Sequence, residues 1–459
     1  MSYESRRSRR KFLNLLGLAA GGALLQNCNA KPPVSQPWQL SPRAISSQAE
    51  VSSVRIGFIP SLEIAPLLVA QKQNIFVKYG LTDVQLLPLA SWQSICDRLE
   101  LGTELGTNTG GLDGGHLCSP LPELLNEGVI TKHTRKTAMY ILMRLHTNGG
   151  YISVSKRMKP FAVQLQRAAF APFQDVARFF GSPIKSAIAE AGDNYDLWLR
   201  YWLSAMTIIP DRHMEIMAIP PAQIQEQVRQ NQADLLCLNG WQTWQLASAN
   251  LAEPAISIAD IWQNYPGELL AMRADWVDKF PIATQALMQA IMEAQIWCDD
   301  PVNWNQLNTM LAFNLTDSAD LVNAPLKISA QLFKNRFFVN RDRRQREQSP
   351  RSPQNTPSLA LKYWSSNGIS VSYPYKSHDL WFLTEYRRWH RLPEKFEIKE
   401  TIDAVNREDL WRQAARAIGV PDTIIPNTTS RGVETFFDGV TFDPSAPEKY
   451  LAFQRLARI

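Results

Sequence analysis

Short apolar runs alternate with longer amphipathic stretches from residue 54 onward, and this alternation limits the possible folds more than any other feature of the sequence. Residues 54–59 predict a buried strand that Pro60 ends, and residues 65–74 predict the helix after it. The pattern returns as strands at 84–87, 137–142, 151–155, 215–219 and 233–238, with helices at 94–101 and 221–231. Because strands that alternate with helices usually form parallel sheets covered by helices, the predicted fold class is α/β.

Length and charge narrow the possible functions. With 459 residues, 45% of them hydrophobic, the chain can form two or three domains with cores of their own. Of 48 basic and 43 acidic residues, five basic and one acidic lie in residues 1–27, which leaves 43 against 42 in the rest. This near-neutral body excludes the broad basic surface of a nucleic-acid-binding protein. The basic run at about 340–358 is predicted to be an exposed insertion, since no aromatic residues interrupt it to stack bases.

Residues 1–28 predict a targeting signal. Residues 8–13 have a twin-arginine pattern, and the apolar stretch 15–25 is shorter than the roughly 20 residues that span a membrane. The four residues that end at Cys28 resemble a lipobox, with Asn27 in place of the usual small residue. We therefore expect export, lipidation of Cys28, and a Pro- and Ser-rich tether over 29–53 that holds the protein at the periplasmic face of the inner membrane. The alternative is the basic amphipathic start of a cytosolic protein.

Motifs of enzymes and of structural metal sites are absent from the sequence. The five cysteines form no CxxC pair and the six histidines no HxH or HxxxH cluster, so a zinc site is not expected. No GxSxG, GxxxxGKS/T or strand-linked GxGxxG motif occurs, and the glycine-rich stretch 110–115 predicts a tight turn before a helix at Pro122. Cysteines other than Cys28 are predicted to be buried free thiols, although one disulfide stays possible. No residue is therefore predicted to be catalytic.

Collinear motifs extend along most of the chain, from RIGFIP at 55–60 through LDGGH at 112–116 to DLWLRYW at 196–202. The C-terminal third adds YKSHDLWFLTE at 375–385 and SRGVETFFDG at 430–439. These motifs resemble the solute-binding lipoproteins of nitrate- and bicarbonate-type ABC importers. The resemblance covers residues 54–458 apart from the insertion.

That resemblance implies a two-lobed clamshell of the type II-like periplasmic-binding-protein fold, with the ligand in a cleft between the lobes. By analogy the first lobe takes residues 54–145 and is completed by 240–459, which include the C-terminal region, and the second lobe takes 146–239. Such a cleft can desolvate a small ion when both lobes supply polar partners. The implied function is capture of a small oxyanion and its delivery to the membrane permease of an ABC importer, without covalent chemistry.

Four positions of the family's ligand pocket can be placed on this sequence, and three of them differ from the nitrate-binding relatives. Trp92 is retained, whereas Gly150 stands in place of Gln, Tyr195 in place of His, and Glu268 in place of Lys. Bicarbonate-binding relatives also carry Glu at the last position and are thought to bring calcium with the anion. The resemblance therefore makes Trp92, Gly150, Tyr195 and Glu268 candidate ligand-binding residues, and Glu268 a candidate calcium ligand.

The change to Glu268 disfavours a bare nitrate ion. Unit charges 4 Å apart interact by about 4 kcal/mol at an effective dielectric constant near 20, so replacing attraction by repulsion could cancel the binding free energy of a micromolar site, about 8 kcal/mol. Three possibilities stay open: a divalent cation bridges Glu268 to an oxyanion, the solute is neutral or cationic, or binding is lost. Each of the four residues also has a structural interpretation, as a packed aromatic ring, a turn glycine or a member of an ion pair.

Three functions are compatible with the sequence. The first is a solute-binding component of an importer of this type. The second is a sensing or regulatory paralogue that keeps the fold without supplying a permease, which a neighbouring gene for a kinase or regulator would favour. The third is an enzyme, because a related clamshell occurs in pyrimidine-precursor synthesis, but the sequence lacks the His or Cys cluster that an enzyme would need.

Overall fold

The computed structural model describes residues 48–103, 110–161, 163, 165, 183–315 and 361–454, all of which belong to one compact unit. The predicted signal with Cys28, residues 29–47 of the predicted tether and the predicted insertion at 340–358 lie outside the described residues and stay predictions. Among the helices that the structure describes, none is both long and apolar enough to span a membrane.

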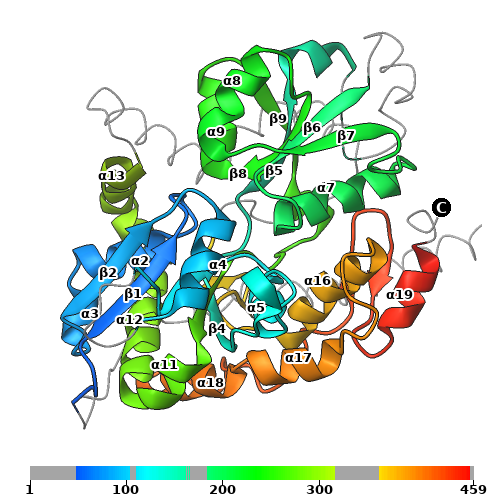
Figure 1. Ribbon diagram of the computed structural model, residues 1–459. Helices are drawn as coiled ribbons and strands as arrows, with labels where there is room; N and C mark the ends of the chain where they lie inside the picture. The colour runs from blue at the N-terminus through cyan, green and yellow to red at the C-terminus, as the bar shows by residue number, and fades with distance from the viewer. Residues whose placement is uncertain are drawn as a thin grey trace, which may run out of the picture. The chain divides into compact units, whose positions relative to one another are not determined.

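The first sheet has the strand order β2–β1–β3–β10–β4 (Figure 1). Its strands are β1 (Ser53–Phe58), β2 (Asp83–Pro88), β3 (Gly114–Leu117), β4 (Met139–Arg144) and β10 (Leu269–Arg273). β1 runs parallel to β2 and β3, whereas β10 is antiparallel to β3 and β4. The helices of this part are α2 (Ala65–Lys72), α3 (Ile75–Lys78), α4 (Trp92–Leu101), α5 (Leu121–Asn126), α11 (Ala274–Lys279), α12 (Pro281–Asp299) and α13 (Trp304–Leu315). Fully buried apolar side chains of β1 and α2, such as Ile56 and Leu67, form part of its core.

The second sheet has the strand order β7–β6–β8–β5–β9. Its strands are β5 (Gly150–Ser155), β6 (Ile184–Ile188), β7 (Met214–Ala218), β8 (Leu235–Asn239) and β9 (Ala252–Ser257). The helices of this part are α7 (Asn194–Ala205), α8 (Ile224–Arg229), α9 (Gly240–Ser248) and α10 (Ile258–Ile261). Because β9 pairs with β5, this sheet extends beyond residue 239. The lobe boundaries given above stay predictions.

Both sheets are mixed, which departs from the purely parallel pairing that the alternation predicts. β6 is parallel to β7 and β8, but β5 is antiparallel to β8 and β9. The chain passes from β4 of the first sheet to β5 of the second with no helix between them, and returns from β9 to β10 through only the single-turn helix α10, so neither passage is the long crossover that joins parallel neighbours. The predicted turn at 110–115 is also partly wrong, since Gly114 and Gly115 begin β3. A Cβ at Gly114 would collide with Met272.

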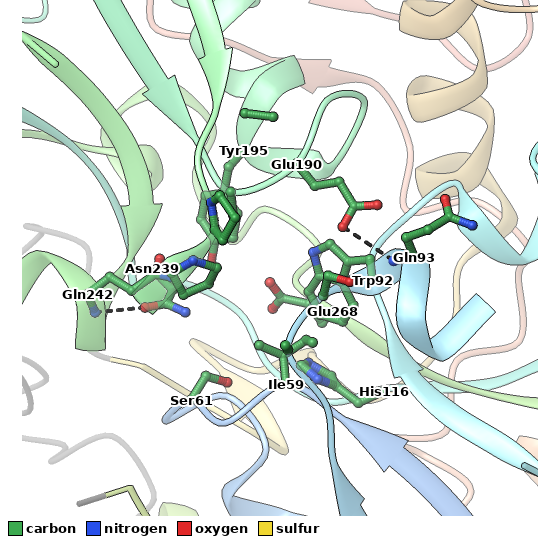
Figure 2. Close-up of a pocket in the computed structure, with 16 residues that line it drawn as sticks. Ile59, Ser61, Trp92, Gln93, His116, Glu190, Tyr195, Asn239, Gln242 and Glu268 are labelled. Atoms are coloured by element: carbon green, nitrogen blue, oxygen red, sulfur yellow. Dashed lines mark hydrogen bonds between the residues drawn. The ribbon is translucent and has the colours of Figure 1, made fainter. Parts of the chain in front are cut away.

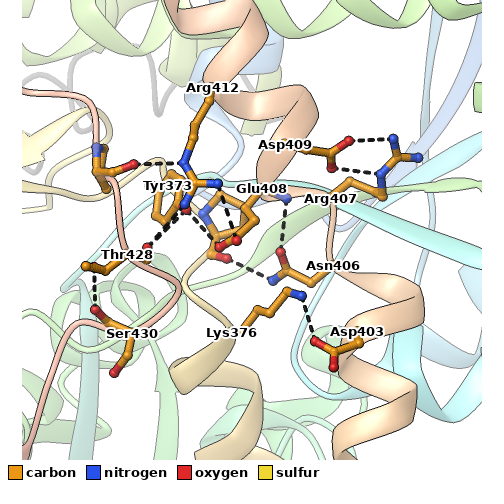
Figure 3. Close-up of polar contacts among 12 residues, drawn as sticks. Tyr373, Lys376, Asp403, Asn406, Arg407, Glu408, Asp409, Arg412, Thr428 and Ser430 are labelled. Atoms are coloured by element: carbon orange, nitrogen blue, oxygen red, sulfur yellow. Dashed lines mark hydrogen bonds and ion pairs between the residues drawn. The ribbon is translucent and has the colours of Figure 1, made fainter. Parts of the chain in front are cut away.

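The helices of the C-terminal third form a layer that packs against the helices of both sheets. Its elements are β11 (Ser365–Ser366), β12 (Ile369–Ser370), α16 (Lys376–Arg388), α17 (Ile398–Val405), α18 (Glu408–Ala417), β13 (Glu434–Thr435), β14 (Thr441–Phe442) and α19 (Pro447–Phe453). Trp381 of α16 stacks on Trp198 of α7, with ring centroids 4.6 Å apart, and both rings are fully buried. Ion pairs and hydrogen bonds also hold α16–α18 and the following segment together, as between Tyr373 and Glu408 (Figure 3).

The four cysteines that the structure describes are free thiols in buried positions, as the sequence predicts. They are Cys96, Cys118, Cys237 and Cys298.

Candidate functional site

A cavity of about 290 Å³ lies between residues that belong to the two sheets. Residues near the first sheet, such as Ile59 and Trp92, form one wall, and residues near the second sheet, such as Tyr195 and Asn239, form the other (Figure 2). Glu268, which directly precedes β10, points its carboxylate into the space between them. This is the volume of a small-molecule site that two parts of the chain build together.

Three helices begin at this cavity. Ser91 caps α4, Asp193 caps α7 and Asn239 caps α9, each with a side-chain oxygen that accepts a backbone N–H of the first turn. Trp92, Tyr195 and Gln242, which line the cavity, lie in those first turns. Helix N-termini carry partial positive charge, so they supply positive potential here. No Lys or Arg is among the described residues that line the cavity.

Glu268 forms a buried ion pair with a histidine. His146 Nε2 contacts the Glu268 carboxylate, and His146 Nδ1 lies 3.2 Å from the carbonyl oxygen of Asn148. Although burial opposes ionisation, the charge and hydrogen bond of His146 lower the pKa of Glu268 to about 2. Burial likewise opposes the imidazolium, but Glu268 raises the pKa of His146. Each partner therefore favours the charged form of the other, Glu268 is ionised at neutral pH, and its partner is a histidine, not a Lys or Arg.

A second carboxyl lies behind this pair. Glu63 is 1% exposed, and neither of its carboxyl oxygens has a hydrogen-bond partner among the described residues. Burial, together with the nearby charge of Glu268, raises the pKa of Glu63 to about 7. Glu63, Glu268 and His146 thus share one small buried volume beside the cavity.

The structure brings three of the four predicted residues to the cavity. Trp92, Tyr195 and Glu268 line it, and the buried hydroxyl of Tyr195 has no hydrogen-bond partner within the described ranges. Gly150 lies behind the Tyr195 ring, where its N–H donates to the Tyr265 hydroxyl at 2.7 Å. A Cβ at Gly150 would lie 2.9 Å from both the Tyr195 ring and that hydroxyl. A glycine at 150 therefore makes room for the two tyrosines.

Sequence reasoning missed most of the polar residues that line the cavity, and two of them bear directly on its chemistry. His116 on β3 is 1% exposed, its ring packs edge-on against Trp92 with centroids 5.0 Å apart, and neither ring nitrogen has a partner in the described part of the chain. Burial lowers the pKa of His116 to about 4, so the imidazole is neutral at pH 7. The other residue is Glu190, whose carboxylate accepts the N–H of Gln93 at 3.4 Å (Figure 2). The LDGGH motif contained a signal for His116, but its glycines pointed to a turn instead of a strand.

The cavity does not contain a ready-made metal site. Among the described residues, no group of three or more His, Cys, Asp or Glu side chains is placed to hold a metal ion. The side-chain oxygens at the cavity come from the carboxylates of Glu190 and Glu268, from hydroxyls and from amides; the other residues are Ser61, Ser91, Gln93, Tyr195, Asn239 and Gln242. Such hard oxygens suit calcium, which takes six to eight of them, but the two carboxylates belong to no group of three acidic, His or Cys side chains among the described residues. A calcium ion would fit only with oxygens from a bound solute and water.

Comparison with known proteins places the chain among its relatives. The model of the NMT1-like family matches residues 47–312. The chain belongs to this family. It is 39% identical over 451 residues to the nitrate/nitrite binding protein NrtA of Synechococcus elongatus, and the alignment covers 97% of each chain. It is 35% identical over 463 residues, 98% of each chain, to the bicarbonate-binding protein CmpA of the same species.

A solved structure extends the comparison to the fold. The crystal structure of the periplasmic nitrate-binding protein NrtA from Synechocystis PCC 6803 aligns with 88% of the present chain, and the alignment covers 99% of the NrtA chain. The TM-score is 0.75 and the sequence identity 36%. The resemblance predicted from the motifs and the two-lobed periplasmic-binding-protein fold are therefore confirmed.

Proposed function

We propose that this protein is the solute-binding component of an ABC importer of the nitrate, nitrite or bicarbonate type. It is exported to the periplasmic side of the membrane, held there through Cys28, and delivers its solute to a membrane permease. The observation that carries this proposal is the cavity between the two sheets, where three helix N-termini and unpartnered polar groups of the described residues converge. Full-length similarity to binding proteins named for nitrate, nitrite and bicarbonate supports it.

The charges at the cavity favour an oxyanion that arrives with a cation. Glu268 and Glu190 are the carboxylates that line the cavity, and the one imidazolium in contact with Glu268 is His146. A bare univalent anion would meet a net negative wall, and the helix N-termini offset only part of it. We infer that a divalent cation, with calcium as the candidate, joins Glu268 to a small oxyanion such as bicarbonate. The NMT1-like relative named for bicarbonate is consistent with this choice.

The other candidate residues then have distinct roles. The Trp92 ring forms an apolar wall, and the Tyr195 hydroxyl donates a hydrogen bond to the solute. His116, neutral and without a partner among the described residues, is a second donor. Gly150 acts indirectly, because its missing side chain leaves the space that Tyr195 fills. No residue is assigned a catalytic role.

Calorimetry and thermal shift on the purified protein test the proposal. We expect bicarbonate to bind and raise the unfolding temperature only when calcium is present, since a ligand stabilises by about 2.7 kcal/mol at a hundredfold excess over its Kd. Glu268→Gln should abolish the calcium-dependent rise. Glu226→Gln also replaces a carboxylate by an amide, but on an exposed side chain of α8, and it should leave the calcium-dependent rise in unfolding temperature intact. A clear rise with nitrate alone would contradict the role of the cation.

A further inference from the structure

Glu190 reaches across the cavity from one part of the fold to the other. It follows β6 of the second sheet, whereas its carboxylate lies at the first turn of α4, beside the first sheet (Figure 2). Its Oε2 accepts the backbone N–H of Gln93, the second residue of α4. Burial raises the pKa of Glu190, and the N–H groups of Gln93 and Trp92 act in the opposite direction.

The first turn of α4 is the place where an incoming anion would find backbone donors. Free N–H groups and the helix dipole both favour a negative group at such an end. A second observation points to a ligand in the same cavity. His116, buried and in ring contact with Trp92, lines the cavity there with two ring nitrogens that have no partner in the described ranges.

We propose that Glu190 is a specificity-determining residue, a built-in carboxylate that occupies the anion-binding corner at the N-terminus of α4. A bare univalent oxyanion must then compete with Glu190 for the same donors and is repelled by its charge. An oxyanion neutralised by a cation at Glu268 binds in the remaining part of the cavity without meeting this competition. This inference rests on the proposed function and adds the residue that selects between the two kinds of solute.

A merely structural role for Glu190 makes a different prediction. If its contact with Gln93 only held the two walls of the cavity together, its loss would weaken the binding of every solute. If it blocks the corner, its loss strengthens the binding of bare anions alone. The sign of the change for nitrate therefore separates the two roles.

The experiment measures the Kd of nitrate without calcium, and of bicarbonate with calcium, for the wild type, Glu190→Gln and Glu190→Ala. We expect nitrate to bind at least tenfold more tightly to both variants, because both remove the charge. Binding of bicarbonate with calcium should change less than threefold. Glu226→Gln, with the same charge change on an exposed helix, should alter neither Kd. The unfolding temperature without solute checks that each variant is folded, and the isosteric Gln variant keeps the test valid if the Ala variant is unstable.

Two results would overturn the inference: unchanged nitrate affinity in both variants, or an equal loss of affinity for both solutes. Failure of the proposed function looks different. If the wild type does not bind bicarbonate with calcium but the variants gain nitrate binding, the proposed solute is wrong while the role of Glu190 stands.

Discussion

Two buried acid–base pairs differ in their surroundings, although their basic residues lie only two positions apart where the chain leaves the first sheet. Arg144, the last residue of β4, pairs with Asp379 of α16, and Asn406 Nδ2 donates to the second Asp379 oxygen at 2.8 Å. His146 pairs with Glu268, but around that pair Glu63, His116 and Tyr195 keep polar atoms without partners among the described residues. The first pair is enclosed, and the second borders the cavity.

This difference indicates that the Arg144–Asp379 pair serves the stability of the fold, whereas the Glu268–His146 pair belongs to the solute site. A buried polar group left without a partner costs about 1–3 kcal/mol, and such groups occur at both pairs, as at Arg144 Nε and the Glu123 carboxyl near the first, so the difference lies in access to the cavity. The Asp379 carboxylate has protein partners on both oxygens and needs no solute. The unpartnered groups of His116 and Tyr195 line the cavity instead, where a bound solute can reach them. Mutations at each pair should therefore affect different measurements.

The largest expected effect is on stability at the enclosed pair. Asp379→Ala removes the partner of a fully buried arginine, and an uncompensated buried charge costs about 3–5 kcal/mol. Urea denaturation should show a loss of that size, while the folded fraction keeps its solute affinity within about threefold. Asp409→Ala breaks a partly exposed pair with Arg407 and should cost about 1 kcal/mol or less. Equal losses in the two variants would contradict the comparison.

The next effect is the pH dependence that Glu63 introduces beside the cavity. Its pKa rises from the ordinary value of 4.5 to about 7 in the folded state, so between those pH values the folded protein binds a proton that the unfolded chain has released. Stability should therefore fall as pH rises through this window, by about 3 kcal/mol at 1.36 kcal/mol for each pKa unit. Glu63→Gln should remove this part of the decline.

Denaturation curves from pH 5 to 8 measure this effect. The difference between wild type and Glu63→Gln reports Glu63 together with its electrostatic coupling to the Glu268–His146 pair, which is present in both. Glu226→Gln, at an exposed position, provides the control and should run parallel to the wild type. If the curve of Glu63→Gln is also parallel to the wild type, Glu63 is ionised in the folded state throughout this range.

Local sequence patterns predicted most strands but not how they pair. The strand expected at 54–59 is β1 (Ser53–Phe58), and that expected at 233–238 is β8 (Leu235–Asn239). Short-range alternation of apolar residues determines such elements. Pairing direction depends instead on where the chain crosses between sheets, as at β5 and β10, and no local pattern contains that information.

The cavity was predictable only in part, for the same reason. The family resemblance supplied Trp92, Tyr195 and Glu268, all of which line it. It did not supply His146, which is 122 positions from Glu268 in sequence, or Glu190, whose partner Gln93 lies 97 positions away. Contacts over such separations follow from the tertiary fold. The charge argument from Glu268 alone therefore lacked the histidine that pairs with it.

The smallest effect should distinguish His116 from another buried histidine of the same kind. His378 on α16 is also buried, with both ring nitrogens unpartnered within the described residues, but it does not line the cavity. Replacing either ring by Leu removes an unpartnered polar group, so the stability of the two variants should change similarly, by about 1 kcal/mol or less. Only His116→Leu should weaken the binding of bicarbonate with calcium, by about tenfold or 1.4 kcal/mol, measured by calorimetry. If both variants bind bicarbonate with calcium as tightly as the wild type does, an unpartnered imidazole does not mark the solute site. That result would contradict the distinction between the cavity and the enclosed region around α16.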